Sequence, residues 1–206
     1  EGFVGVNQSS LDRLKTHTNM SDEFLIDALG QSRLSFSSPN PSVETLVHSF
    51  IPARYVFHTH PEAILALTNQ KNGDELIQKA TGGKTIVIPY VMSGFPLALQ
   101  ISRALKHNKD NNTIVVLKHG VFTFGDTAQD AYDSMIRVVA NSEKFIRSTR
   151  KKLKTNPRKP SFKLENLAPV LRGALIPSSA TEQRYILSFR DSPVIKNFLG
   201  FSNMSR

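Results

Sequence analysis

Two histidines, His58 and His60, stand two residues apart in an apolar run and could bind one metal ion together. The run over 55–60 is rich in aromatic and β-branched residues and is followed by Pro61, which predicts a short strand. Side chains at this spacing share one face of a strand, with Cβ atoms about 7 Å apart. Taken alone, the pair is explained slightly better as two solvated or hydrogen-bonded rings at a strand end than as metal ligands. The rest of the sequence must distinguish these two interpretations.

A third histidine, His119, stands in a similar place. It follows the continuous apolar run 113–117, which is typical of a buried strand. The chain has no cysteine, so thiolate ligands and disulfides are excluded and a metal would need His, Asp or Glu. Three histidines from strand ends and one carboxylate would complete a ligand set for Zn²⁺.

Glu44 is the candidate carboxylate. It lies near the start of a predicted helix that begins at Ser42 and is ended by Pro52, and His48 follows it by one turn on the same face. An exposed helix position is the alternative for Glu44. Judged by their spacing from the histidines, three other carboxylates are also candidates for the fourth ligand: Asp22, Glu62 and Asp126.

Helices and strands alternate along the chain. Helical patterns cover 22–30, 42–51, 61–69, 96–107 and a long segment from Thr127, and strand patterns cover 55–60, 85–91, 113–117 and 121–124. A further helix over 164–175 and a strand over 184–189 follow. This order predicts a layered α/β or α+β domain whose sheet is covered on both faces.

Composition favours a globular protein, since 39% of the 206 residues are hydrophobic and 21% are charged. No apolar run approaches the roughly 18 residues that cross a bilayer, and the first residues lack the features of a signal peptide, so no membrane partner and a cytoplasmic location are expected.

The net charge is +9. Segment 144–163 alone holds nine basic residues and no acidic one, which we interpret as a solvated helix end entering a linker rather than a nucleic-acid site.

Several short motifs, taken together and in order, resemble the class II aldolase/adducin family between about residues 36 and 148. They contain Pro41, Ser42, Glu44 and His48, then His58, His60 and Pro61, then Pro89, Tyr90 and Gly94, then His119 and Gly120, then Phe124 and Gly125. The resemblance implies a three-layer α/β/α domain with a central, largely antiparallel sheet covered by helices on both faces. It also implies a homotetramer with active sites at subunit boundaries.

The same resemblance assigns roles to residues. It implies that His58, His60 and His119 bind zinc, or another divalent transition metal, and that Glu44 is the catalytic acid/base. A divalent ion on a ketone and a hydroxyl oxygen stabilises the enediolate left by carbon–carbon cleavage, while Glu44 carries the proton. Ser42 matches a serine that contributes to the substrate's phosphate pocket, with a helix cap as its alternative role. His48 is expected to contact or pack against the metal-binding residues rather than to bind the metal itself.

The C-terminal part resembles a different segment. Residues 167–174 and 184–191 are similar to the stretch that joins the aldolase domain to a short-chain dehydrogenase domain in bifunctional rhamnulose-1-phosphate aldolase/alcohol dehydrogenases. The predicted domains are therefore 1–153, a class II aldolase/adducin-like domain without its N-terminal part, and 154–206, an extension toward a possible following domain.

The resemblance implies that a phosphorylated sugar is cleaved: a ketose 1-phosphate, L-rhamnulose 1-phosphate, to dihydroxyacetone phosphate and L-lactaldehyde. A sugar-phosphate epimerase or dehydratase on the same scaffold, or a non-catalytic adducin-like binding module, are the alternatives. Two departures stand against the family pattern. No Gly-Asn-x-Ser phosphate loop occurs in 1–35, and no tyrosine lies between His60 and Lys84 to exchange a proton with the aldehyde.

Overall fold

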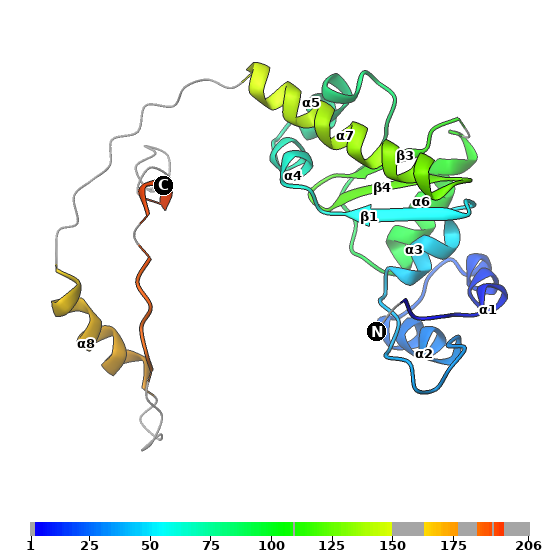
Figure 1. Ribbon diagram of the computed structural model, residues 1–206. Helices are drawn as coiled ribbons and strands as arrows, with labels where there is room; N and C mark the ends of the chain where they lie inside the picture. The colour runs from blue at the N-terminus through cyan, green and yellow to red at the C-terminus, as the bar shows by residue number, and fades with distance from the viewer. Residues whose placement is uncertain (1–2, 109, 150–162, 177–184, 191, 196–206) are drawn as a thin grey trace. The chain divides into compact units, whose positions relative to one another are not determined.

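The computed structural model describes five stretches of the chain (Figure 1): residues 3–108, 110–149, 163–176, 185–190 and 192–195. The chain divides into two compact units, Glu1–Arg150 and Lys151–Arg206, which we describe separately. The domain boundary expected after residue 153 stays a prediction.

The first unit alternates helices and strands. In chain order they are α1 (Gln8–Asp12), the 3₁₀ helix η1 (Arg13–Thr16), α2 (Asp22–Gln31), α3 (Thr45–Phe50), β1 (Tyr55–Thr59), α4 (Glu62–Thr68), α5 (Gly73–Thr81), β2 (Ile86–Ile88), α6 (Phe95–Lys106), β3 (Thr113–Val116), β4 (Gly120–Gly125) and α7 (Ala128–Thr149). The predicted helices and strands of this unit lie within a few residues of the observed ones. Three helices, α1, η1 and α5, were not indicated by the sequence patterns.

The four strands form one sheet in the order β1-β4-β3-β2. The pairs β1–β4 and β3–β4 are antiparallel, and β2 runs parallel to β3. The expectation of a largely antiparallel sheet is confirmed. In this register His58 lies directly opposite Phe122, and Val116 at the end of β3 lies opposite Gly120 at the start of β4.

Each face of the sheet carries its own core, because side chains alternate between faces along a strand. Ile114, Val116 and Phe122 belong to the larger core, which also takes buried side chains from α1, α2, α3 and α6. Val115 and Val121 belong to a second core with α4, α5 and α7. Figure 1 shows α7 on one side of the sheet and α3 with α6 on the other. The predicted α/β/α layering is confirmed.

Local hydrogen bonds explain where several helices begin and end. Ser21 accepts from the Phe24 N–H at the start of α2, and Thr127 accepts from the Asp130 N–H at the start of α7. Gly82 ends α5 with φ +68°, a left-handed conformation that glycine adopts without strain. The predicted starts of α2 and α7 therefore have a physical cause.

The second unit contains α8 (Leu164–Leu175), as predicted. The strand predicted over 184–189 is wrong within the described part, since residues 185–190 have no regular secondary structure. All six of these residues are exposed, and the described part of this unit contains no strand that could pair with them.

No helix in the described stretches is both long and apolar enough to cross a bilayer.

Candidate metal centre

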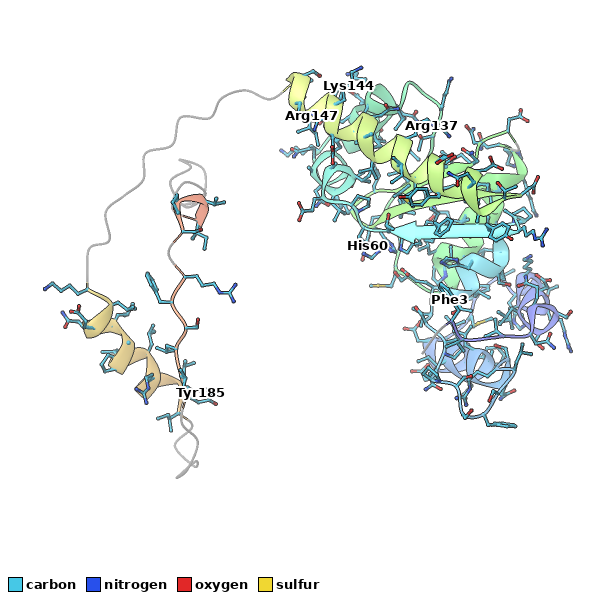
Figure 2. All side chains as sticks on the ribbon, viewed as in Figure 1. Phe3, His60, Arg137, Lys144, Arg147 and Tyr185 are labelled. Carbon is cyan, nitrogen blue, oxygen red and sulfur yellow. The ribbon has the colours of Figure 1, made fainter. Side chains whose placement is uncertain are left out.

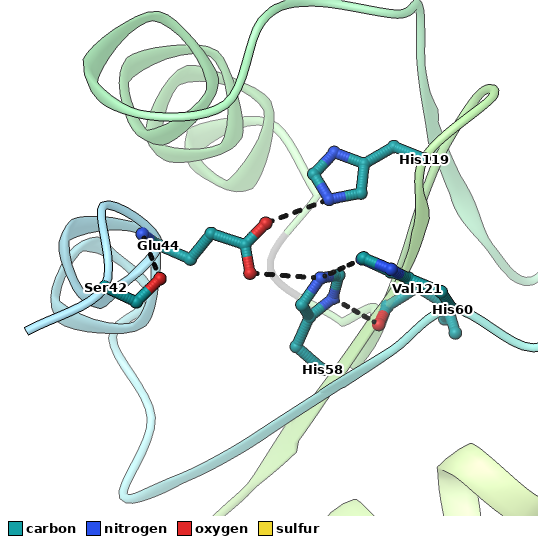
Figure 3. A network of polar contacts seen from close by, with 6 residues as sticks. All are labelled: Ser42, Glu44, His58, His60, His119 and Val121. Atoms are coloured by element: carbon teal, nitrogen blue, oxygen red, sulfur yellow. Dashed lines mark hydrogen bonds and ion pairs between the residues drawn. The ribbon is translucent and has the colours of Figure 1, made fainter. Parts of the chain in front are cut away.

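The structure brings together the four residues that the sequence singled out for metal chemistry: Glu44, His58, His60 and His119. One nitrogen or oxygen atom from each lies within 4.8 Å of the corresponding atom of every other (Figure 3). The four come from separate elements: the residue before α3, strand β1, the residue after β1, and the turn between β3 and β4. The sheet topology therefore assembles the cluster from positions up to 75 residues apart.

His58 on β1 and His60 just after this strand converge through their Nε2 atoms. His58 Nε2 and His60 Nε2 are 2.8 Å apart, and the rings meet edge to face. His58 also lies over the ring of Phe122, with centroids 3.8 Å apart and planes within 10°. Phe122 faces His58 because the two residues are cross-strand partners. The aromatic stack thus fixes the plane in which His58 presents its nitrogen.

A backbone carbonyl fixes the proton of His58. Its Nδ1 lies 3.0 Å from the carbonyl oxygen of Val121, which can only accept a hydrogen bond. Neutral His58 therefore carries its proton on Nδ1, and the Nε2 lone pair faces the cluster. Metal-binding histidines are commonly oriented in this way by a carbonyl or carboxylate on the other ring nitrogen.

Glu44 lies across the cluster from the strand histidines. Its Oε1 is 3.0 Å from His119 Nε2, and its Oε2 is 3.4 Å from His58 Nε2. A hydrogen bond from the protonated form of His58 is the main cause that lowers the pKa of Glu44 to about 2. Burial opposes this effect, and the positive charge that His58 and His119 can carry adds to it. The carboxylate is therefore ionised at neutral pH.

His119 lies in a tight turn whose backbone is strained. Lys118, the residue before it, has φ +59°, which is uncommon for a residue with a side chain. The turn is held by hydrogen bonds from the Leu117 N–H to Ile88 and from the His119 N–H to Val116. Burial, followed by the charge of His58, lowers the pKa of His119, so the ring is neutral at pH 7. Its Nε2–H donates to Glu44 Oε1, and a bound metal ion would replace that proton.

Gly120 leaves the space that the two strand histidines occupy. A Cβ atom built at Gly120 would lie 2.5 Å from His60 Cδ2, 2.6 Å from the Thr59 carbonyl oxygen and 3.1 Å from His58 Cε1. Only glycine fits here without displacing a ring or the β1 backbone. Sequence reasoning noted His119 and Gly120 as a motif but not this requirement, which depends on the pairing of β1 with β4.

The two remaining predicted site residues lie beside the cluster. The Ser42 hydroxyl accepts a hydrogen bond from the Glu44 N–H at 3.2 Å, so Ser42 and Glu44 form a turn and α3 begins only at Thr45. His48 meets the edge of the Phe122 ring, with centroids 6.1 Å apart, and thus touches the same aromatic ring as His58. Burial is the main cause that lowers the pKa of His48.

The donor set fits a divalent transition metal. Zinc–nitrogen bonds of about 2.0–2.1 Å place the ligand atoms of a four-coordinate ion roughly 3.3 Å apart. The observed separations between neighbouring donor atoms are 2.8, 3.0 and 3.4 Å. His60 is the exposed member, so the cluster is open to solvent on its side. Among the carboxylates with similar spacing, Asp22, Glu62 and Asp126 are absent from this cluster.

The lowered pKa values have a consequence for stability without metal. His48 and His119 have lower pKa values in the folded state than the ordinary 6.5, so the unfolded chain binds more protons as the pH falls below 6.5. The free energy of unfolding of chelator-treated protein is expected to fall between pH 7 and pH 5, which urea denaturation can measure. The decline should be shallower in His48→Gln and unchanged in His107→Gln, an exposed histidine at the end of α6. A free energy that stays flat or rises would contradict this expectation.

Comparison with known proteins agrees with this fold. The family described as Class II Aldolase and Adducin N-terminal domain matches residues 1–143. The chain belongs to this family.

Individual relatives support the assignment. The solved N-terminal class II aldolase domain of a conserved protein from Thermoplasma acidophilum is 39% identical, with a TM-score of 0.66 over 70% of this chain and 67% of that one. The methylthioribulose-1-phosphate dehydratase of Methylococcus capsulatus is 30% identical over 149 residues, 64% of this chain and 71% of that protein. The uncharacterized oxidoreductase YuxG of Bacillus subtilis is 29% identical over 96% of this chain. The chain spans only 29% of the length of YuxG.

Proposed function

We propose that the chain is a metal-dependent aldolase that cleaves a ketose 1-phosphate, with L-rhamnulose 1-phosphate as the substrate, to dihydroxyacetone phosphate and L-lactaldehyde. The convergence of three imidazoles and one ionised carboxylate at a solvent-open position carries the proposal. The dehydratase that is 30% identical has a phosphorylated sugar derivative in its name, which supports a substrate of this class.

The proposed cofactor is Zn²⁺, held by His58, His60 and His119 with Glu44 beside it. When bound, such an ion supplies Lewis-acid stabilisation of negative charge on the ketone and hydroxyl oxygens of the substrate. Neutral imidazoles suit this role, and the hydrogen bond from His58 Nδ1 to Val121 keeps the ring in position. Another divalent transition metal could take the same place, because affinity follows the metal series as well as the ligands.

Glu44 carries the proton in the proposed reaction. When the carbon–carbon bond breaks, the hydroxyl group on the departing carbon loses its proton to solvent and becomes the aldehyde, and the electron pair of the broken bond stays on the carbon next to the ketone. Glu44, which takes up a proton from solvent in the same cycle, then gives that carbon a proton. In the direction of synthesis, the carboxylate removes the same proton. The low pKa of Glu44 supports the second role, since the group is ready to accept a proton at pH 7.

Ser42 is the proposed contact for the substrate phosphate. Its oxygen already accepts from the Glu44 N–H, so its hydroxyl proton is free to be donated to an anion near the cluster. His48 is a proposed positioning residue that acts through Phe122, the ring on which His58 lies.

A dehydratase is the second candidate function. One relative is a methylthioribulose-1-phosphate dehydratase, and its match covers 71% of that protein. Removal of water would pass through an enolate and cleavage of a carbon–carbon bond would produce one. A metal ion held by the four residues would stabilise the negative charge in both cases, so the cluster would serve either reaction. The products distinguish them, because only the aldolase releases dihydroxyacetone phosphate. A sugar-phosphate epimerase and an adducin-like binding module remain further alternatives.

The two parts of the chain have separate proposed roles. Residues 1–153 are the proposed catalytic domain and 154–206 the proposed extension toward a following domain. YuxG is named as an oxidoreductase and is more than three times as long as this chain. Its match covers almost the whole chain, so it includes most of the proposed extension, and this supports the division. The cytoplasmic location stays a prediction from the sequence.

We also propose assembly as a homotetramer. Exposed apolar side chains gather on the α7 side of the edge strand β1, namely Tyr55 and Phe57 on β1 and Tyr132 and Ile136 on α7. An exposed apolar patch beside an unpaired strand edge favours association with a second copy.

The proposed reaction is tested with zinc-loaded protein and two substrates. L-Rhamnulose 1-phosphate and methylthioribulose 1-phosphate are supplied separately, and dihydroxyacetone phosphate is measured by coupled reduction. We expect dihydroxyacetone phosphate from the first substrate at a rate that depends on added metal. Dehydration of the second substrate without cleavage of the first would favour the dehydratase. Failure to convert either substrate, with the metal bound, would contradict the proposed substrate class.

A further inference from the structure

A cavity lies on the opposite face of the sheet from the metal cluster. Its volume is about 850 Å³, within the range of small-molecule sites. It is bounded by the end of α5, the loops before β2 and β3, the start of β3, and α7 from its middle to its end. His58 faces the core of α3 and α6, whereas this cavity opens beside α5 and α7, and none of the metal-cluster residues lines it. The cavity is therefore a separate place on the molecule.

Positive charge converges on this cavity. Four cationic side chains from two helices and the α5–β2 loop line it: Lys79, Lys84, Arg137 and Lys144. Among the described residues of the lining, Asp110 is the only acid. Lys79 also lies 3.7 Å from Glu75, but both side chains are exposed, and a pair of this kind neutralises little charge. Figure 2 shows Arg137 and Lys144 along α7, away from His60.

The wall of the cavity contains a buried hydroxyl that lacks an acceptor. Ser134 is only 2% exposed, and its Oγ accepts hydrogen bonds from Asn112 Nδ2 and Arg137 Nη2, both at 2.8 Å. Because amide and guanidinium groups only donate here, the proton of Ser134 must point elsewhere. No acceptor for it occurs among the described residues. A buried donor without a partner is unfavourable, so a ligand oxygen in the cavity would satisfy it.

The groups around Ser134 are held in place before any ligand arrives. Thr113 donates to Asn112 Oδ1 at 3.2 Å, which sets the amide so that its NH₂ group faces Ser134. Arg137 is tied to Ser134 by one guanidinium nitrogen. Its other N–H groups have no hydrogen-bond partner among the described residues, so they can bind an anion as a fork. A fixed guanidinium and a hydroxyl donor, surrounded by lysines, are groups that recognise phosphate.

We propose that this cavity binds a small phosphorylated organic anion that carries at least two negative charges. Ser134 and Arg137 bind its phosphoryl oxygens, and Lys84 and Lys144 supply the surrounding positive field. A compact anion is favoured over nucleic acid because the charges surround a concave site with a buried donor, rather than following an extended stripe. This site is independent of the metal centre and of the reaction proposed for it.

Pyrophosphate is the probe for the test, measured by titration calorimetry at 0.1 M salt. The titration uses the metal-free triple variant His58→Ala, His60→Ala, His119→Ala, so that the probe cannot act through bound zinc, and is repeated with chelator-treated parent protein. We expect saturable binding of one pyrophosphate in both. Added to the triple variant, Ser134→Ala and Arg137→Gln are each expected to weaken binding about tenfold or more.

Arg147→Gln is the matched control. It removes the same charge from the same helix, but Arg147 pairs with Glu143 and does not line the cavity. We expect less than a twofold change in affinity. Equal weakening by Arg147→Gln and Arg137→Gln would overturn the proposal, because it would indicate a diffuse basic surface. Absence of binding at millimolar pyrophosphate, or tighter binding of a single-stranded oligonucleotide that Ser134→Ala leaves unchanged, would also overturn it.

Discussion

Replacing Gly120 with alanine is expected to remove most of the metal affinity of the chain while leaving the fold in place. The added Cβ would lie 2.5 Å from a carbon of His60 and 2.6 Å from the Thr59 carbonyl oxygen, so the ring and the end of β1 must move. Two proposed ligands lie on that segment. We expect zinc affinity, measured by competition with a chromogenic chelator, to fall about hundredfold or more, since lesser disturbances around a metal site cost 10–100-fold.

Gly30→Ala is the control for this substitution. Gly30 lies within α2, and a Cβ there would meet nothing within 4 Å. Alanine should therefore leave zinc affinity unchanged and stabilise the helix by up to about 1 kcal/mol. Circular dichroism shows whether Gly120→Ala remains folded; a loss of about 1–3 kcal/mol is expected from the crowding. Parent-like zinc affinity in a folded Gly120→Ala protein would contradict the proposed ligands.

Glu44→Gln is expected to lower kcat by about 10²- to 10⁴-fold, the range for loss of a general acid/base. Glutamine has nearly the same shape, but its amide cannot carry the proton. It also lacks the charge that now contacts His58 and His119. Because three histidines remain, the protein should still bind zinc. The loss should appear in kcat more than in KM, since Glu44 acts on the reacting carbon rather than on the phosphate.

Glu62→Gln separates this effect from a general loss of carboxylate charge. Glu62 is exposed at the start of α4 and lies outside the cluster. The Glu62→Gln protein should keep parent-like kcat and zinc content. A Glu44→Gln protein that holds zinc and turns over the sugar phosphate at the parental rate would remove Glu44 from the proposed mechanism.

The sequence was sufficient for the elements that depend on local patterns. Ser21 and Thr127 indicated the starts of α2 and α7, because a hydroxyl at these positions accepts a hydrogen bond from a backbone N–H of the first turn. The two-residue spacing of His58 and His60 placed both rings on one face of β1, where their nitrogens meet. These predictions needed no knowledge of distant residues.

Long-range pairing decided what the sequence did not reveal. The stacking of His58 on Phe122 and the space left by Gly120 both follow from the β1–β4 register, which no local pattern encodes. The late start of α3 follows from the turn between Ser42 and Glu44, which competes with the helix. The site that surrounds Ser134 joins α7 to the loop before β3, and its residues have no common spacing in the sequence.

Elemental analysis of the purified chain tests the proposed metal centre most directly. After incubation with zinc and removal of the excess, we expect about one zinc ion per chain in the parent protein. The double variant His58→Ala, His119→Ala should hold almost none, and His107→Gln should match the parent. A parent protein that takes up no transition metal, or a double variant that retains as much zinc as the parent, would contradict the proposed metal centre.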